Sequence, residues 1–82
     1  MAGIETSLLA ELKSTRATDT IKGIEQYGSA GIHDVCLRSY YEAVTQVPLS
    51  PILKRRTTRV LSNIWGSKWK SVYQVWIKAQ PL

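Results

Sequence analysis

Two prolines near the middle of the chain constrain its fold most strongly. Pro48 has no backbone N–H and disfavours the helical conformation in the residue before it, so a helix that approaches it must end by about Val47. Ser50 followed by Pro51 is the pattern of a helix N-cap with proline at the first helical position. The sequence therefore predicts one helix that ends before Pro48 and another that begins at Pro51.

The segment before Pro48 has the clearest helical periodicity in the chain. Its apolar and small residues recur at three- and four-residue steps, namely Ile32, Val35, Cys36, Ser39, Tyr40, Ala43, Val44 and Val47. Such a stripe is typical of a helix that packs on a core, and Asp34 in its first turn suits the helix dipole. We expect this to be the central helix of the domain.

The helix that begins at Pro51 is expected to reach about Trp65 and to be amphipathic. Its predicted inner side carries Leu53, Thr57, Val60, Leu61 and Ile64, and its outer side carries Arg55, Arg56 and Arg59. Beyond Gly66, an apolar cluster of Trp69, Val72, Tyr73 and Trp76 lies roughly 130° from that inner side on the same helical wheel. A straight helix cannot bury both groups, so we predict a break near Gly66.

Residues 69–78 fit both a helix and a strand. Their β-branched and aromatic content favours a strand, whereas a strand would find a partner only in residues 60–65. The helical interpretation is preferred and gives an all-α domain, a small bundle of four to five short helices. The alternative is a winged-helix-like domain in which residues 60–78 form a β-hairpin.

The first part of the chain supplies the remaining helices of this prediction. Apolar spacing predicts a first helix over residues 4–14. A second helix is expected to be capped by Thr18 or Asp19, to turn Ile24 inward, and to stop at Gly28.

Length and composition indicate a single domain over residues 1–82. A chain of 82 residues is too short to divide its core, and 44% hydrophobic content is that of an ordered globular protein. One cysteine cannot form an internal disulfide, which favours a reducing compartment. We expect an intracellular protein, cytoplasmic or in the nucleoid or nucleus, with no targeting signal and no transmembrane segment.

Charge divides the chain into two unlike halves. Residues 1–50 contain four basic and six acidic residues, a net charge of −2, whereas residues 51–82 contain seven basic and no acidic residues, a net charge of +7. All three tryptophans lie in the basic half. Asymmetry of this kind is typical of a surface that meets a polyanion.

The basic half supplies the candidate binding residues. Phosphate contacts are predicted for Lys54, Arg55, Arg56, Arg59, Lys68, Lys70 and Lys78. Base stacking or a protein interface is considered for Trp65, Trp69, Tyr73 and Trp76, although aromatic residues are more often core in a chain without Phe. The leading hypothesis is a non-enzymatic domain that binds DNA or RNA. The alternative is a protein-interaction or self-associating subunit that uses the Trp-rich basic C-terminal segment, with an acidic protein or a second copy of the chain as its partner. A membrane-surface helix is the third.

Catalytic and metal chemistry find little support in the sequence. His33 and Cys36 stand three residues apart, but Cys36 lies within an apolar stripe where a thiol behaves as a small hydrophobe. One cysteine and one histidine cannot complete a structural zinc site of four ligands. The acidic residues are scattered, and no glycine-rich phosphate loop occurs. We therefore expect no enzyme activity, no metal and no cofactor.

Overall fold

The computed structural model describes residues 16–81, and this part of the chain is mostly helical. It contains α2 (Asp34–Thr45), α3 (Pro51–Trp65) and α4 (Trp69–Ala79), with short 3-10 turns η1 (Gly31–His33) and η2 (Gly66–Lys68). Residues 16–27 are helical as well. The all-α prediction is confirmed, and the alternative β-hairpin over residues 60–78 is wrong, because those residues lie in α3, η2 and α4.

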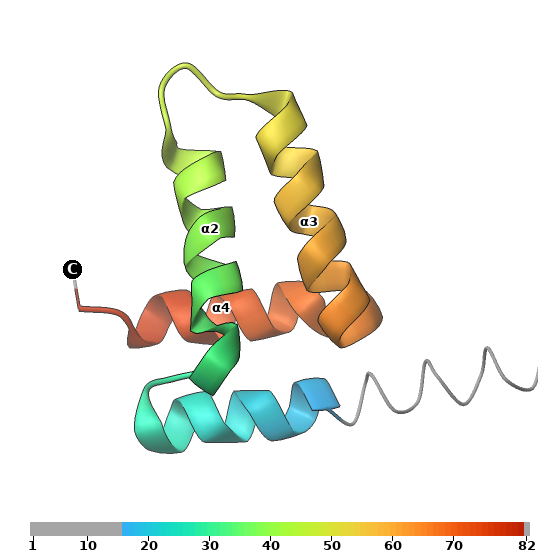
Figure 1. Ribbon diagram of the computed structural model, residues 1–82. Helices are drawn as coiled ribbons and strands as arrows, with labels where there is room; N and C mark the ends of the chain where they lie inside the picture. Colours follow the sequence, from blue (N-terminus) through green and yellow to red (C-terminus); the bar gives the residue numbers. More distant parts are fainter. Residues whose placement is uncertain (1–15, 82) are drawn as a thin grey trace, which may run out of the picture.

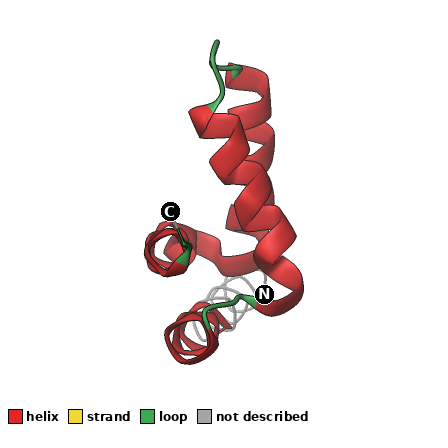
Figure 2. Ribbon diagram, turned by 90° about the vertical axis from the view of Figure 1, so that its left-hand side faces the viewer, coloured by secondary structure: helices red, strands yellow, loops and turns green. Residues whose placement is uncertain are grey.

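The helices form an upright hairpin on a crosswise base. Figure 1 shows α2 and α3 side by side and antiparallel, with α4 and residues 16–27 crossing near the end of the hairpin remote from its connecting loop. In Figure 2, turned by 90°, the two crosswise segments are seen end on. The predicted bundle of four to five helices is therefore not found. The far half of the hairpin projects from the base, so α3 is covered there by α2 alone.

The predicted helix boundaries around the prolines and Gly66 are confirmed. The Ser50 hydroxyl accepts the backbone N–H of Leu53 at 3.3 Å, and Pro51 is the first residue of α3. Gly66 ends α3 with φ 61° and ψ −141°, a backbone conformation that a side chain would strain. This residue gives the chain the sharp turn between α3 and α4.

Of the two helices predicted in the first part of the chain, the structure describes the second, which it contains. Gly28 has φ 74° and its N–H bonds to the carbonyl of Ile24 at 2.7 Å, so the predicted stop is confirmed. Thr18 and Asp19 are not caps, because residues 16 and 17 are already helical. The helix predicted over residues 4–14 lies outside the described residues.

The core lies where the crosswise segments meet the hairpin. Its fully buried members come from every helical segment described and are Ala17, Ile24, Leu37, Leu61, Trp65, Val72 and Trp76. The indole N–H of Trp65 donates to Thr20 Oγ1 at 3.1 Å, and that of Trp76 donates to Asp34 Oδ1 at 3.0 Å. Both large rings are thus buried without leaving an unpaired donor.

The predicted inner side of α2 is partly wrong. Val35 is 73% exposed and Val47 is 95% exposed, whereas Leu37, which lies off the predicted stripe, is completely buried. Tyr40 explains the difference, because its ring lies edge-on to Trp69 and Tyr73 of α4 at 5.2 and 4.7 Å. The covered side of α2 is therefore decided by the crossing of α4 as well as by α3.

The inner side of α3 is also displaced from its prediction. Leu61 is buried as expected and Trp65 is buried with it, but Leu53 and Val60 remain about two-fifths exposed. In the projecting half of the hairpin, α2 covers only one side of α3 (Figure 1).

Asp34 joins three parts of the fold. Its Oδ1 accepts the backbone N–H of Ala30 at 2.7 Å together with the indole of Trp76, and its Oδ2 accepts the Ser29 hydroxyl at 2.8 Å. The start of α2 is thereby tied to the preceding turn and to α4. The sequence predicted only the favourable position of this carboxylate on the helix dipole.

Asp34→Ala is expected to lower the free energy of unfolding by about 3 kcal/mol, because three bonds to a charged group are lost and the buried indole of Trp76 loses its acceptor. Urea unfolding followed by circular dichroism measures this loss. Asp34→Asn keeps one side-chain acceptor and should lose less, and Asp19→Ala, at an exposed site, should stay within about 0.5 kcal/mol of the wild type. Equal losses in Asp34→Ala and Asp19→Ala would contradict the joining role.

The ionisation of Tyr73 is expected to make the stability of the domain depend on alkaline pH. Burial raises the pKa of Tyr73 above its usual value of 10.0, and the neighbouring Tyr40 and Tyr41 raise it further. The unfolded chain then loses the phenolic proton of Tyr73 at a lower pH than the folded chain. The contribution of Tyr73 to the free energy of unfolding is therefore complete below pH 10.0 and is lost as the pH rises above it. Tyr73→Phe should show a shallower alkaline loss of stability in pH-dependent urea unfolding. Tyr27→Phe, at a 77% exposed site, should match the wild type.

Candidate nucleic-acid interface

Four cationic side chains are exposed on the first part of α3. Lys54, Arg55, Arg56 and Arg59 form what we call the basic face, and each of them is exposed. The Ser50 cap and Pro51 fix the start of this helix, so the four residues follow within its first nine positions. They lie on the projecting half of the hairpin, where a long partner can approach without meeting the base (Figure 1).

Within the described residues, no ion pair neutralises the basic face, although Glu42 of α2 lines a hollow together with Leu53 and Thr57 of α3. The chain contains no acidic residue after Glu42, and within residues 16–81 none of the four side chains makes an ion pair. The first turn of α3 also lacks an acid, so the positive end of the helix dipole adds to the side-chain charges. Cations gathered in this way repel one another and attract an anionic partner.

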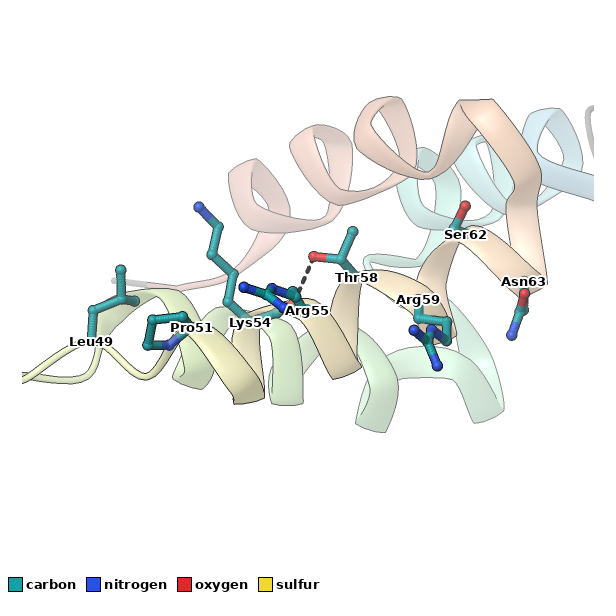
Figure 3. A pocket seen from close by; sticks show the side chains of 8 residues that line it. All are labelled: Leu49, Pro51, Lys54, Arg55, Thr58, Arg59, Ser62 and Asn63. Atoms are coloured by element: carbon teal, nitrogen blue, oxygen red, sulfur yellow. Dashed lines mark hydrogen bonds between the residues drawn. The ribbon is translucent and has the colours of Figure 1, made fainter.

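An open groove runs along the same helix. It has a volume of about 590 Å³ and is lined by Leu49, Pro51, Lys54, Arg55, Thr58, Arg59, Ser62 and Asn63 (Figure 3). Figure 3 shows Lys54, Thr58 and Ser62 pointing to one side of α3 and Arg59 and Asn63 to the other. Charged and hydrogen-bonding groups thus extend the basic face toward the end of the helix.

The hydroxyl groups of the two threonines in α3 donate their protons to hydrogen bonds within the helix. Thr57 Oγ1 donates to the carbonyl of Leu53 at 2.9 Å, and Thr58 Oγ1 donates to that of Lys54 at 2.7 Å. Each hydroxyl therefore keeps only acceptor capacity for a partner. Contact with phosphate oxygens, which also accept, falls to the lysine and arginine side chains.

The other predicted phosphate-binding residues lie on different elements. Lys68 belongs to η2 and Lys70 to the first turn of α4, where its Nζ lies 5.8 Å from the ring centre of Trp69. Lys78 is near the opposite end of α4, beside a groove that it shares with Glu25. All three are exposed, but the structure places them apart from the four residues on α3.

The tryptophans are mainly structural. Trp65 and Trp76 are 0% and 2% exposed, so neither ring offers a free surface to a base, and the stacking role is corrected for both. Trp69 and Tyr73 are half-buried against Tyr40. In a chain without Phe, these rings supply the bulk of a small core.

His33 and Cys36 also belong to the packing around the core. The His33 ring lies edge-on to Trp65 with centres 5.4 Å apart, and Cys36 is half-buried against the core cluster. Sequence reasoning missed Ser62 and Asn63 as members of the α3 groove. The four-residue steps from Arg55 to Arg59 and on to Asn63 are the signal that could have found the latter.

Comparison with known proteins supplies no relative for this arrangement. No family model matches the chain, and no curated protein or solved structure is similar to it. Within residues 16–81, none of the helices combines the length and the apolar character needed to cross a bilayer. Interpretation of the site therefore rests on its residues and their geometry.

Proposed function

We propose that this domain binds nucleic acid without catalysing a reaction, and that it holds phosphate groups on the basic face of α3. The observation that supports the proposal is a single helix with four exposed cations, none of which is paired with an acidic side chain of the described residues. Lysine and arginine side chains bind phosphates by charge-assisted hydrogen bonds and release condensed counterions, and the release drives association. A helix that projects from its base gives a rod-like polyanion room to lie along it (Figure 1).

Lys68 and Lys70 extend this proposal to longer partners. They follow α3 at the corner with α4, so a nucleic acid lying along the hairpin toward its base would come near them. Lys78, at the other end of α4 and beside Glu25, is assigned a minor part. The proposal therefore ranks the four α3 residues above the three lysines.

A panel of probes tests the proposed function. The full-length protein is freed of co-purified nucleic acid by a high-salt wash, followed by its ultraviolet absorbance ratio, and is titrated with duplex DNA, duplex RNA and single strands by fluorescence anisotropy. We expect binding to at least one of these polyanions that weakens steadily as salt increases. Absence of binding at low salt, or affinity that salt does not change, would contradict the proposal.

Self-association is the second candidate function, and exposed apolar side chains on the hairpin favour it. Ile32, in η1, is 87% exposed, and Val35, in the first turn of α2, is 73% exposed. A second copy related by two-fold symmetry would cover these side chains with their own equivalents. Sedimentation equilibrium over a range of protein concentrations decides the question, and a concentration-independent monomer would rule this candidate out.

A further inference from the structure

The polar residues of α3 continue beyond the basic face in a regular line. Arg55, Arg59 and Asn63 stand at four-residue steps, and all three are exposed. Asn63 stands eight positions after Arg55, which corresponds to a rise of about 12 Å along the helix. Figure 3 shows Arg55, Arg59 and Asn63 along α3, with Thr58 and Ser62 pointing to the side opposite to Arg59 and Asn63.

We propose that α3 is a recognition helix that reads base edges in the major groove of B-form DNA. In this arrangement Arg55, Arg59 and Asn63 face the bases, while Lys54 and Arg56 flank them and hold phosphates. The proposal rests on the nucleic-acid binding proposed above and names its substrate class. It also adds sequence preference, which phosphate contacts alone do not provide.

The side chains in this line have the chemistry of direct readout. The arginine guanidinium donates two parallel hydrogen bonds to the O6 and N7 atoms of guanine, and the asparagine amide pairs in the same way with the N6 and N7 atoms of adenine. The about 12 Å between the first and last residues corresponds to between three and four base pairs at about 3.4 Å each. The line can therefore address a short run of adjacent base pairs.

The shape of the hairpin suits a B-form groove. The major groove is about 12 Å wide and admits one α-helix. The side of α3 that carries Arg55 and Arg59 is exposed, whereas Leu61 and Trp65, on the side toward the rest of the fold, are buried.

The same observations disfavour the other nucleic acids. Sequence-specific binding of single strands uses exposed aromatic rings for stacking, but α3 has no aromatic residue before Trp65, which is buried. Duplex RNA has a deep and narrow major groove that side chains cannot read. Duplex DNA is the form that an α-helix lined by Arg and Asn fits best.

Selection from a random-sequence DNA duplex library tests the proposal with the full-length protein. We expect enrichment of a short common sequence that the protein prefers over a scrambled duplex of the same composition by about tenfold or more. The selected sequence made as an RNA duplex should bind more weakly than the DNA. Failure to enrich any sequence, or equal affinity for the DNA and RNA duplexes, would overturn the recognition role.

Two variants that leave the net charge of the protein unchanged separate base readout from phosphate binding. Asn63→Ala should reduce the preference for the selected duplex by about tenfold and leave the affinity for the scrambled duplex unchanged. Arg59→Lys keeps the charge but loses the two-pronged geometry, so it should have a similar effect on preference. Gln74→Ala, an exposed amide on α4, is the matched control and should behave as the wild type.

The outcomes also distinguish this inference from the proposed function. Salt-dependent binding of all duplexes without preference, or an unchanged preference in both variants, would overturn the recognition role and leave phosphate binding intact. Absence of binding to every probe would overturn both proposals. Circular dichroism of each variant establishes that its helices are formed before affinities are compared.

Discussion

Trp65→Ala is expected to remove a large part of the stability of the domain. Trp65 is completely buried, its ring packs against His33, and its N–H bonds to Thr20 Oγ1. Truncation of a buried aromatic side chain costs about 3–5 kcal/mol, and a chain of this size has a total stability on the order of 4–12 kcal/mol. Urea unfolding followed by circular dichroism and by the fluorescence of the two remaining tryptophans measures the loss.

Milder substitutions separate the contributions of Trp65. Trp65→Phe keeps most of the apolar contact and gives up the N–H, whereas Thr20→Val removes the acceptor together with the exposed bond from its hydroxyl to the carbonyl of Arg16 and should cost about 1 kcal/mol. A Trp65→Ala variant as stable as the wild type would show that the ring lies outside the core. The stacking role that its burial argues against would then have to be considered again.

Reversal of two arginines on α3 is expected to produce the largest functional effect. Arg55→Glu with Arg59→Glu replaces two attractive contacts by two repulsive charges on the same helix. Affinity for duplex DNA at low salt should fall on the order of 100-fold or more. Both side chains are exposed and make no ion pair within the described part of the chain, so the fold should be retained.

A matched variant shows whether position or net charge is responsible. Arg16→Glu with Lys22→Glu changes the net charge by the same amount on the exposed side of residues 16–27. When both variants are compared at about 100 mM salt, we expect a clearly smaller loss of affinity there, because long-range attraction is then screened within about 10 Å. Equal losses in the two variants would mean that binding follows net charge and that α3 has no special part.

Local signals in the sequence were sufficient to predict most helix boundaries. Pro51 after Ser50 begins α3, and Gly66 ends it, because each acts on the backbone of its own segment. The choice between helix and strand after Gly66 was correct for a similar reason, since Trp69 and Val72, three residues apart, share a side in a helix but lie on opposite faces of a strand. These features depend on neighbours within one or two turns.

The arrangement of the helices could not be predicted in the same way. The burial of Leu37 and the exposure of Val35 depend on where α4 crosses α2, a contact between segments that lie far apart in the chain. Spacing within α2 alone does not contain that information. The hydrogen bond from Trp76 to Asp34 likewise spans 42 positions in the sequence.

The candidate site was predictable where it lies on one helix. Arg55, Arg56 and Arg59 share the outer side of α3 because helical geometry places them there. Lys78 was grouped with them by charge alone, and the crosswise course of α4 separates it from α3 (Figure 1). Asn63 was not predicted because it carries no charge and lies beyond Arg59, the last arginine of α3.

The salt dependence of duplex DNA binding tests the central claim most directly. The dissociation constant for a scrambled duplex, on which all four side chains of the basic face are proposed to contact phosphate, is measured between about 50 and 200 mM NaCl for the wild type and for Arg55→Ala with Arg59→Ala. Four phosphate contacts predict a slope of log affinity against log salt of about −3.6, and loss of two contacts predicts about −1.8. A slope near zero for the wild type, or the same slope for both proteins, would contradict phosphate binding by the basic face of α3.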